Sequence, residues 1–181
     1  MLAVKFGAAR GHTLVEMLVV LAIGAILLGL AVQGMRTLAE RQRIAAAAND
    51  FLLALHTART EALARGARID VVSLDGGAGW SGGGAVLADN NGNRLPDPGE
   101  EQLLRRVDLP PGLMVSAILT DPQPPAYIAY NGSGRTQTDA ASNTPQLGTL
   151  TFTLGEQIRR IKINFLGRAR LCIPAIETTG C

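Results

Sequence analysis

The sequence predicts an α+β fold in which one long N-terminal helix packs on a mainly antiparallel β-sheet head. Two observations support this prediction. Residues 14–65 keep a helical pattern, almost purely apolar in the first half and amphipathic in the second. From residue 67 onward, short apolar or alternating runs are separated by Gly, Pro, Asn and Asp, which is typical of strands and turns.

The composition narrows the class of protein. The chain has 181 residues, of which 47% are hydrophobic and 18% charged, so it suits one domain with an appendage. The charge-free run from Met17 to Val32 argues against both a disordered chain and an ordinary cytosolic domain. The formal net charge is +2, and Lys5 and Arg10 account for it. Any affinity for nucleic acid must therefore come from a local basic patch.

The apolar run at residues 14–32 is long enough to cross a membrane, and the basic residues before it would stay cytoplasmic. It could be a signal peptide cut near Gly29–Ala31, a simple anchor, or a processed anchor that later packs into a polymer. Helical patterning continues beyond the run, which argues against a signal peptide. Glu16 argues against a simple anchor, because a carboxylate at bilayer depth costs about 2 to 3 kcal/mol without a partner.

These features resemble type IV prepilins and pseudopilins. The residues that carry the resemblance are a short basic leader ending at Gly11, then His12-Thr13-Leu14-Val15-Glu16 and the apolar helix. The resemblance implies that a prepilin peptidase cleaves after Gly11 and methylates His12, a position where the family usually has phenylalanine. It also implies that Glu16 guides assembly by pairing with a neighbouring subunit's amine, which would neutralise a carboxylate in apolar surroundings.

The chain is thus expected to comprise a leader (1–11), a transmembrane and assembly helix (12–34) and a periplasmic pilin head (35–181). In the head we expect an amphipathic helix over 35–65, ended by Gly66, and a β region over 67–181. The expected core positions of the helix are Ala48, Phe51, Leu52, Leu55, Ala58 and Ala62. The clearest expected strands are IDVVSL, GAVLA, LMVSAIL, TLTFTL and IRRIKINF, and loops are expected at 74–84, 121–125 and 135–148.

The head further resembles the GspH/FimT group of minor pilins and pseudopilins. The matching segments are LLALHTARTEALARG, GWSGGGAVLADNNGNRLPDPGEEQLL, AYNGSGR and INFLGRARLC. The resemblance implies a fibre component at or near the tip, and it does not choose between a pilus and type II secretion.

Two short segments have the spacing of enzyme motifs but lack the neighbouring residues or elements that such motifs need, so no enzymatic activity is expected. Residues 79–83 (GWSGG) have the spacing of a nucleophile elbow, but neither histidine, His12 nor His56, follows the serine. Gly77, Gly79 and Gly82 have a dinucleotide-binding spacing, but strand and turn residues follow where a helix is needed.

No cofactor is expected, although residues 89–100 have part of a calcium-loop pattern. The pattern has a glycine at its sixth position, where this chain has Arg94, and two prolines stiffen the second half. An Asx-rich turn is therefore the favoured interpretation. The weak calcium candidates are Asp89, Asn91, Asn93, Asp97 and Glu100.

Two cysteines close to the C-terminal end of the sequence, Cys172 and Cys181, predict a disulfide in an oxidising compartment.

Residues 156–171 form a basic segment, with five positively charged side chains and one acidic side chain, that of Glu156. Strand alternation is expected to bury Ile161, Ile163 and Phe165, while Arg160, Lys162 and Asn164 take the other face. Gly167 would allow a turn that presents Arg168 and Arg170 together.

The Gly167-Arg168-Ala169-Arg170 segment resembles the GRxR motif of FimT-like minor pilins, a group linked to DNA binding in natural transformation. Guanidinium groups bind phosphate without reading base sequence, which suits capture of any DNA. The alternative is that these arginines are solvated or pair with acids at 97–108. The candidate DNA-binding residues are Arg159, Arg160, Lys162, Gly167, Arg168 and Arg170.

We therefore expect an inner-membrane protein with a single span and a periplasmic head, incorporated into a type IV pilus and binding DNA for uptake. The expected partners are other pilins, prepilin peptidase, the inner membrane and DNA. The alternative is a GspH-like minor pseudopilin of type II secretion, whose basic face would contact other pseudopilins or secreted proteins.

Overall fold

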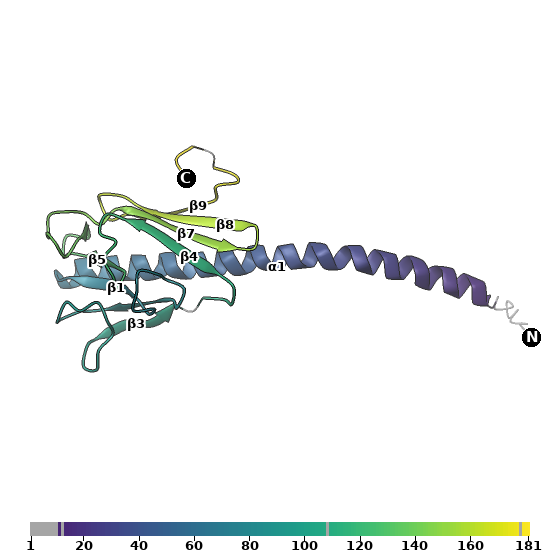
Figure 1. Cartoon of the computed structure of the whole chain (residues 1–181), viewed down its shortest axis with the longest axis horizontal. Helices are drawn as coiled ribbons and strands as arrows, with labels where there is room; N and C mark the ends of the chain where they lie inside the picture. The colour runs from purple at the N-terminus through teal and green to yellow at the C-terminus, as the bar shows by residue number, and fades with distance from the viewer. Residues whose placement is uncertain (1–10, 12, 108, 178) are drawn as a thin grey trace, which may run out of the picture. The chain divides into compact units, whose positions relative to one another are not determined.

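The computed structural model describes residue 11 and residues 13–107, 109–177 and 179–181, without the side chains of residues 30–34, 105 and 106. Among the described residues, helix α1 (Leu14–Arg65) is followed by β-strands and their connecting turns and loops (Figure 1). The chain divides into two compact units, residues 1–39 and residues 40–181. We call the second unit the head.

The first unit holds the N-terminal part of α1. The helix begins after Thr13, whose Oγ1 accepts a hydrogen bond from the backbone N–H of Glu16 (3.2 Å), as an N-cap does. Large apolar side chains from Leu14 to Leu28 are exposed within this unit. No helix in the described part of the chain has a stretch long and apolar enough to cross a membrane. His12 and the side chains of 30–34, which belong to the predicted span, lie outside the described residues.

The head segment of α1 buries one face. Ala48, Phe51, Leu55, Ala58 and Ala62 are fully buried, and Leu52 packs against them as a partly buried side chain, so the predicted core stripe is confirmed. The helix ends where predicted, because Gly66 takes a left-handed conformation (φ 61°) that ends the helix at little cost.

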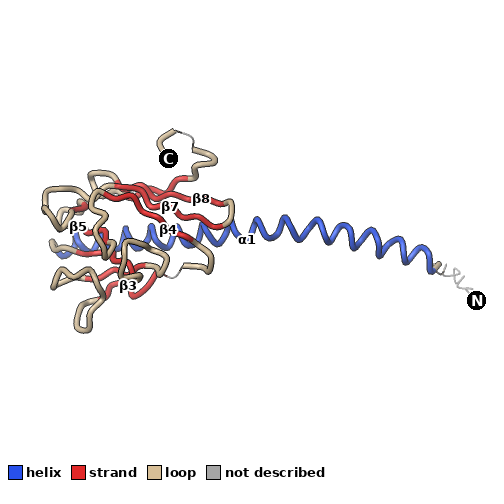
Figure 2. The backbone as a smooth tube through the Cα atoms, in the orientation of Figure 1, coloured by secondary structure: helices blue, strands red, loops and turns tan. Residues whose placement is uncertain are grey.

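In the part of the chain that the structure describes, nine antiparallel strands form two sheets that flank the head segment of α1 (Figure 2). One sheet has the order β3-β2-β1-β5-β6, with β1 (Ile69–Ser73), β2 (Gly84–Leu87), β3 (Gln102–Val107), β5 (Tyr127–Tyr130) and β6 (Thr136–Gln137). The other has the order β4-β7-β8-β9, with β4 (Met114–Leu119), β7 (Gly148–Leu154), β8 (Gln157–Ile163) and β9 (Ala169–Cys172). The predicted α+β class with a mainly antiparallel head is confirmed.

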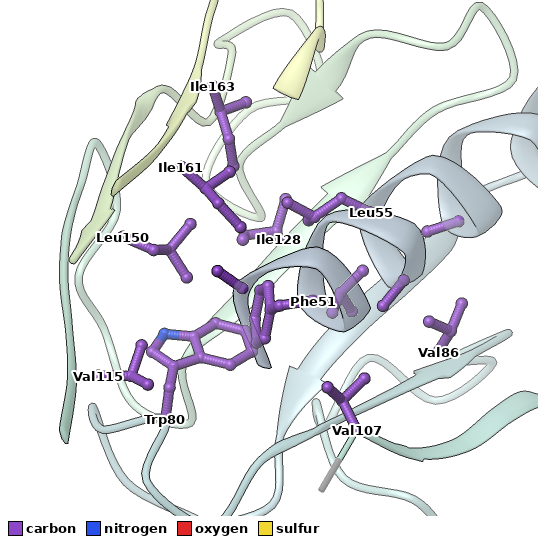
Figure 3. Close-up of a cluster of buried hydrophobic side chains, with 14 of the residues drawn as sticks. Phe51, Leu55, Trp80, Val86, Val107, Val115, Ile128, Leu150, Ile161 and Ile163 are labelled. Carbon is purple, nitrogen blue, oxygen red and sulfur yellow. The ribbon is translucent and has the colours of Figure 1, made fainter. Parts of the chain in front are cut away.

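The core joins α1 to both sheets (Figure 3). Phe51 of α1 contacts the edge of Trp80 at a ring separation of 5.2 Å and Phe152 of β7 at 5.6 Å. Trp80 is fully buried, so the glycine-rich segment between β1 and β2 anchors the core and connects two antiparallel strands. A nucleophile elbow or a dinucleotide site would instead connect a strand to a helix.

Two sequence-based expectations are wrong. Strand alternation predicts Phe165 in the core, but β8 ends at Ile163 and Phe165 lies in the following turn with 61% of its surface exposed. The alternation rule fails there because it holds only while the strand continues. The expected loop at 135–148 contains the short strand β6, which pairs with β5 through Ala129 and Tyr130.

Candidate nucleic-acid interface

Strands β8 and β9 position the basic residues of the candidate site. Arg160 and Lys162 lie on the outer face of β8, opposite Thr151 and Thr149 of β7 in the register. On its other side, Lys162 is directly opposite Arg170 of β9. Directly opposite residues lie about 5 Å apart, so two like charges are held side by side on one face.

The turn between these strands adds a third cation. The side-chain oxygen Oδ1 of Asn164 accepts hydrogen bonds from the N–H groups of Leu166 and Arg168, both at 3.0 Å. Gly167 has φ 72°, and a Cβ there would lie 2.6 Å from the carbonyl oxygen of Gly134. Only glycine fits this position, and the turn leaves Arg168 exposed.

Lys162, Arg168 and Arg170 line one hollow of about 620 Å³, together with Thr149 and Asn164. Positive charge, hydroxyl and amide groups converge there, which is the chemistry that binds phosphate oxygens. The fold therefore brings together three of the predicted basic residues around one concave surface, which we call the basic hollow.

The other predicted basic residues lie elsewhere. Arg159 is opposite Phe152 in the register and shares the side of β8 that carries Ile161, and its Nη1 donates to the Ile158 carbonyl (3.0 Å). Arg160 shares the outer face with Lys162 but does not line the basic hollow.

The C-terminal segment covers part of this basic face. The predicted disulfide between Cys172 and Cys181 is present. Arg160 Nη1 donates to the carbonyl oxygen of Cys181 (3.3 Å), while Lys162 Nζ and Arg170 Nη2 donate to that of Gly180 (3.1 and 2.7 Å). Arg170 also lies 3.8 Å from the carboxylate of Glu177.

These partners differ from the acids at 97–108 that the sequence offered as an alternative. The sequence could not predict these carbonyl contacts, because every residue has a backbone carbonyl and no local pattern distinguishes those of Gly180 and Cys181. Asp108 itself lies outside the described residues.

The calcium candidates at 89–100 hydrogen-bond to their own loop. The carboxylate of Asp89 accepts from the N–H groups of Gly92 (2.7 Å) and Arg94 (2.8 Å). The side-chain amides of Asn91 and Asn93 both donate to Asp97, and Glu100 accepts from the N–H of Asn90 (3.0 Å). This is the arrangement of an Asx-rich turn. In the described part of the chain, no cluster of three or more His, Cys, Asp or Glu side chains could hold a metal ion.

The residues predicted to act in processing and assembly lie in the N-terminal part of the sequence. Gly11 is exposed, Glu16 is in the first turn of α1, and His12 lies outside the described residues.

Comparison with known proteins identifies two segments of the chain. Residues 47–167 match the family model described as type II transport protein GspH, and residues 7–32 match the prokaryotic N-terminal methylation motif. The pilin-like protein PilA1 of Thermus thermophilus is 33% identical over 166 residues, covering 90% of this chain and 97% of that protein.

Two solved structures share the fold. The type IV minor pilin FimU of Pseudomonas aeruginosa has a TM-score of 0.54 at 17% identity, covering 75% of this chain and 92% of FimU. The minor pseudopilin EpsH of the Vibrio cholerae type 2 secretion system has a TM-score of 0.52 at 18% identity, covering 73% of this chain and 98% of EpsH. Both the family model and the pilin-like relative span most of the chain, and the protein therefore belongs to the GspH family of type IV pilins and pseudopilins.

Proposed function

We propose that this protein is a minor type IV pilin that binds DNA without sequence specificity during DNA uptake. The observation that carries the proposal is the basic hollow, where Lys162, Arg168 and Arg170 surround one concave surface. Two of these cations come from paired strands and the third from a hydrogen-bonded turn, so their spacing is set by the backbone. Such a surface contacts phosphates and leaves base edges unread.

The proposal includes processing and assembly. Prepilin peptidase cleaves after Gly11 and methylates His12, and the chain is anchored in the inner membrane with its head in the periplasm until it joins other pilins in the fibre. The methylation motif over residues 7–32 supports this step. We expect mass spectrometry of the chain, produced beside a prepilin peptidase, to find an N-terminal methylated His12. An intact Met1 terminus would contradict this part of the proposal.

A second candidate is a minor pseudopilin of type II secretion. The matched family model, described as type II transport protein GspH, and the fold shared with EpsH favour it. In that role the same basic face would contact another pseudopilin or a secreted protein, so DNA binding separates the two functions.

The experiment compares DNA retention by the full-length chain in detergent with that of an Arg168→Gln/Arg170→Gln double variant. Arg41→Gln is the matched control, because Arg41 is also an exposed arginine but lies on α1 and does not line the basic hollow. We expect the wild type and the control to retain DNA and the folded double variant to lose most retention. Absence of DNA binding by the wild type would overturn the proposal and favour the secretion role.

A further inference from the structure

Two turns of the head share the sequence pattern Asn-x-x-Gly-Arg, at residues 131–135 and 164–168. We call them the twin turns. In the first, Oδ1 of Asn131 accepts hydrogen bonds from the N–H groups of Ser133 (3.0 Å) and Arg135 (3.2 Å), as Asn164 does for the equivalent residues of the second. Gly134 and Gly167 have φ values of 71° and 72°. The turns therefore present Arg135 and Arg168 from equivalent backbone positions.

The twin turns are packed against each other. A Cβ on Gly167 would lie 2.6 Å from the Gly134 carbonyl oxygen and 3.1 Å from Cα of Arg135. Arg59 of α1 joins the turns, because its Nε donates to the Gly134 carbonyl (2.9 Å) and its Nη2 to the Leu166 carbonyl (3.2 Å). The backbone positions of Arg135 and Arg168 are thus fixed relative to each other.

The second of the twin turns carries an exposed aromatic ring. Among the Phe, Tyr and Trp side chains that the structure describes, Phe165 alone is exposed, at 61%, whereas the tyrosines, the tryptophan and the other two phenylalanines are fully buried. No core packing explains an exposed phenylalanine in a turn. It is therefore available to a ligand.

Phe165 and Arg135 line a second hollow of about 280 Å³, close to the lower end of the size range of small-ligand sites. Thr136 also lines it, is only 2% exposed, and has an Oγ1 without a hydrogen-bond partner in the described part of the chain. The hollow thus offers an aromatic ring, a guanidinium and an unsatisfied hydroxyl. The basic hollow adjoins the same turn, because Asn164 and Arg168 line it.

We propose that the twin turns form a subsite for single-stranded nucleic acid, in which Arg135 and Arg168 hold phosphates and Phe165 stacks on an unpaired base. Guanidinium groups suit phosphate oxygens, and a ring can stack on any base, so the subsite needs no particular sequence. A paired duplex keeps its bases stacked on each other and cannot use Phe165. This inference rests on the proposed function, since it adds a subsite beside the basic hollow.

The test measures affinity of the full-length chain in detergent for an oligothymidylate and for a duplex of the same length. We expect Phe165→Ala to weaken single-strand binding by about fivefold or more and to change duplex binding by less than about twofold. Phe165→Leu keeps apolar bulk without a ring and should weaken single-strand binding as much. Arg135→Gln should lower the affinity for both ligands, whereas the Arg41→Gln control should change neither affinity. Because Phe165 is exposed, its variants should keep the wild-type unfolding midpoint.

Several results would overturn the subsite. Stacking by Phe165 is excluded if Phe165→Ala leaves the affinity for the single strand unchanged, or lowers the affinities for single strand and duplex equally. It is also excluded if Phe165→Leu binds the single strand as tightly as the wild type does. Arg135→Gln behaving like Arg41→Gln would exclude the phosphate contact. Failure of the wild type to bind either ligand would contradict the proposed function itself, which distinguishes the two failures.

Discussion

Asp70 is a fully buried carboxylate at the second position of β1. Nε of Arg68 donates to both of its oxygens, at 2.8 and 3.0 Å, and Arg68 Nη2 also lies 2.6 Å from Asp139. Burial raises the pKa of Asp70 from 3.8 to about 6, and the ion pair with Arg68 opposes this shift without cancelling it. Desolvation therefore affects the pKa of Asp70 more strongly than the ion pair with Arg68 does.

The raised pKa of Asp70 predicts how stability depends on pH. Between about pH 4 and pH 6 the folded chain keeps a proton on Asp70 that the unfolded chain has released, so the free energy of unfolding falls as pH rises through this window. Relative to that of Asp70→Asn, the free energy of unfolding of the wild type should fall by up to about 3 kcal/mol between about pH 4 and pH 7. Urea unfolding of both chains across this range measures the difference. A wild type that gains stability over the variant would show that the ion pair dominates.

Arg94 shows why some residue roles could not be predicted. From the sequence, Arg94 was notable only because it replaces the glycine of a calcium-loop pattern. In the structure it takes a left-handed conformation (φ 63°) that non-glycine residues rarely adopt. Its guanidinium lies 4.0 Å above the Tyr127 ring, and its Nε donates to Asp139 at 2.5 Å. These partners are distant in sequence, so no local pattern reveals them.

At the scale of elements, the twin turns depend on glycine. In Gly167→Ala, the new side chain would sit on a left-handed backbone and its Cβ would overlap with Gly134. Gly76 has a similar φ of 68°, but in Gly76→Ala no atom would lie within 4 Å of the new Cβ. We expect Gly76→Ala to cost about 1 kcal/mol of unfolding free energy. Gly167→Ala should cost about 1 to 3 kcal/mol more, from overpacking. Urea unfolding measures both, and equal losses would contradict the close packing of the two turns.

Elements with a regular period were predictable and irregular contacts were not. The stripe from Ala48 to Ala62 and the helix end at Gly66 follow from helical spacing and from glycine's conformational freedom. Strand alternation placed Arg160 and Lys162 on one face. The repeated Asn-x-x-Gly-Arg pattern was visible in the sequence, but the packing of its two copies depends on Arg59 and on sheets that only the folded chain brings together.

At the scale of the whole molecule, a net charge of +2 gives no general attraction to polyanions. The proposed DNA binding therefore depends on local concentration of charge in the basic hollow. The carbonyl oxygens of Gly180 and Cys181 accept hydrogen bonds from cations of the same face, so part of the donor capacity there is used within the chain. Useful affinity in a fibre would then draw on several subunits.

The salt dependence of DNA binding tests this account most directly. Each phosphate contact releases condensed counterions, so the logarithm of the association constant falls with the logarithm of the salt concentration, by a slope of about 0.9 per contact on duplex DNA. For the full-length chain we predict a steep fall, and for Arg168→Gln/Arg170→Gln a slope shallower by about 2 units with weaker binding at low salt. Binding that is insensitive to salt, or a double variant with the wild-type slope and affinity, would contradict DNA binding through the basic hollow.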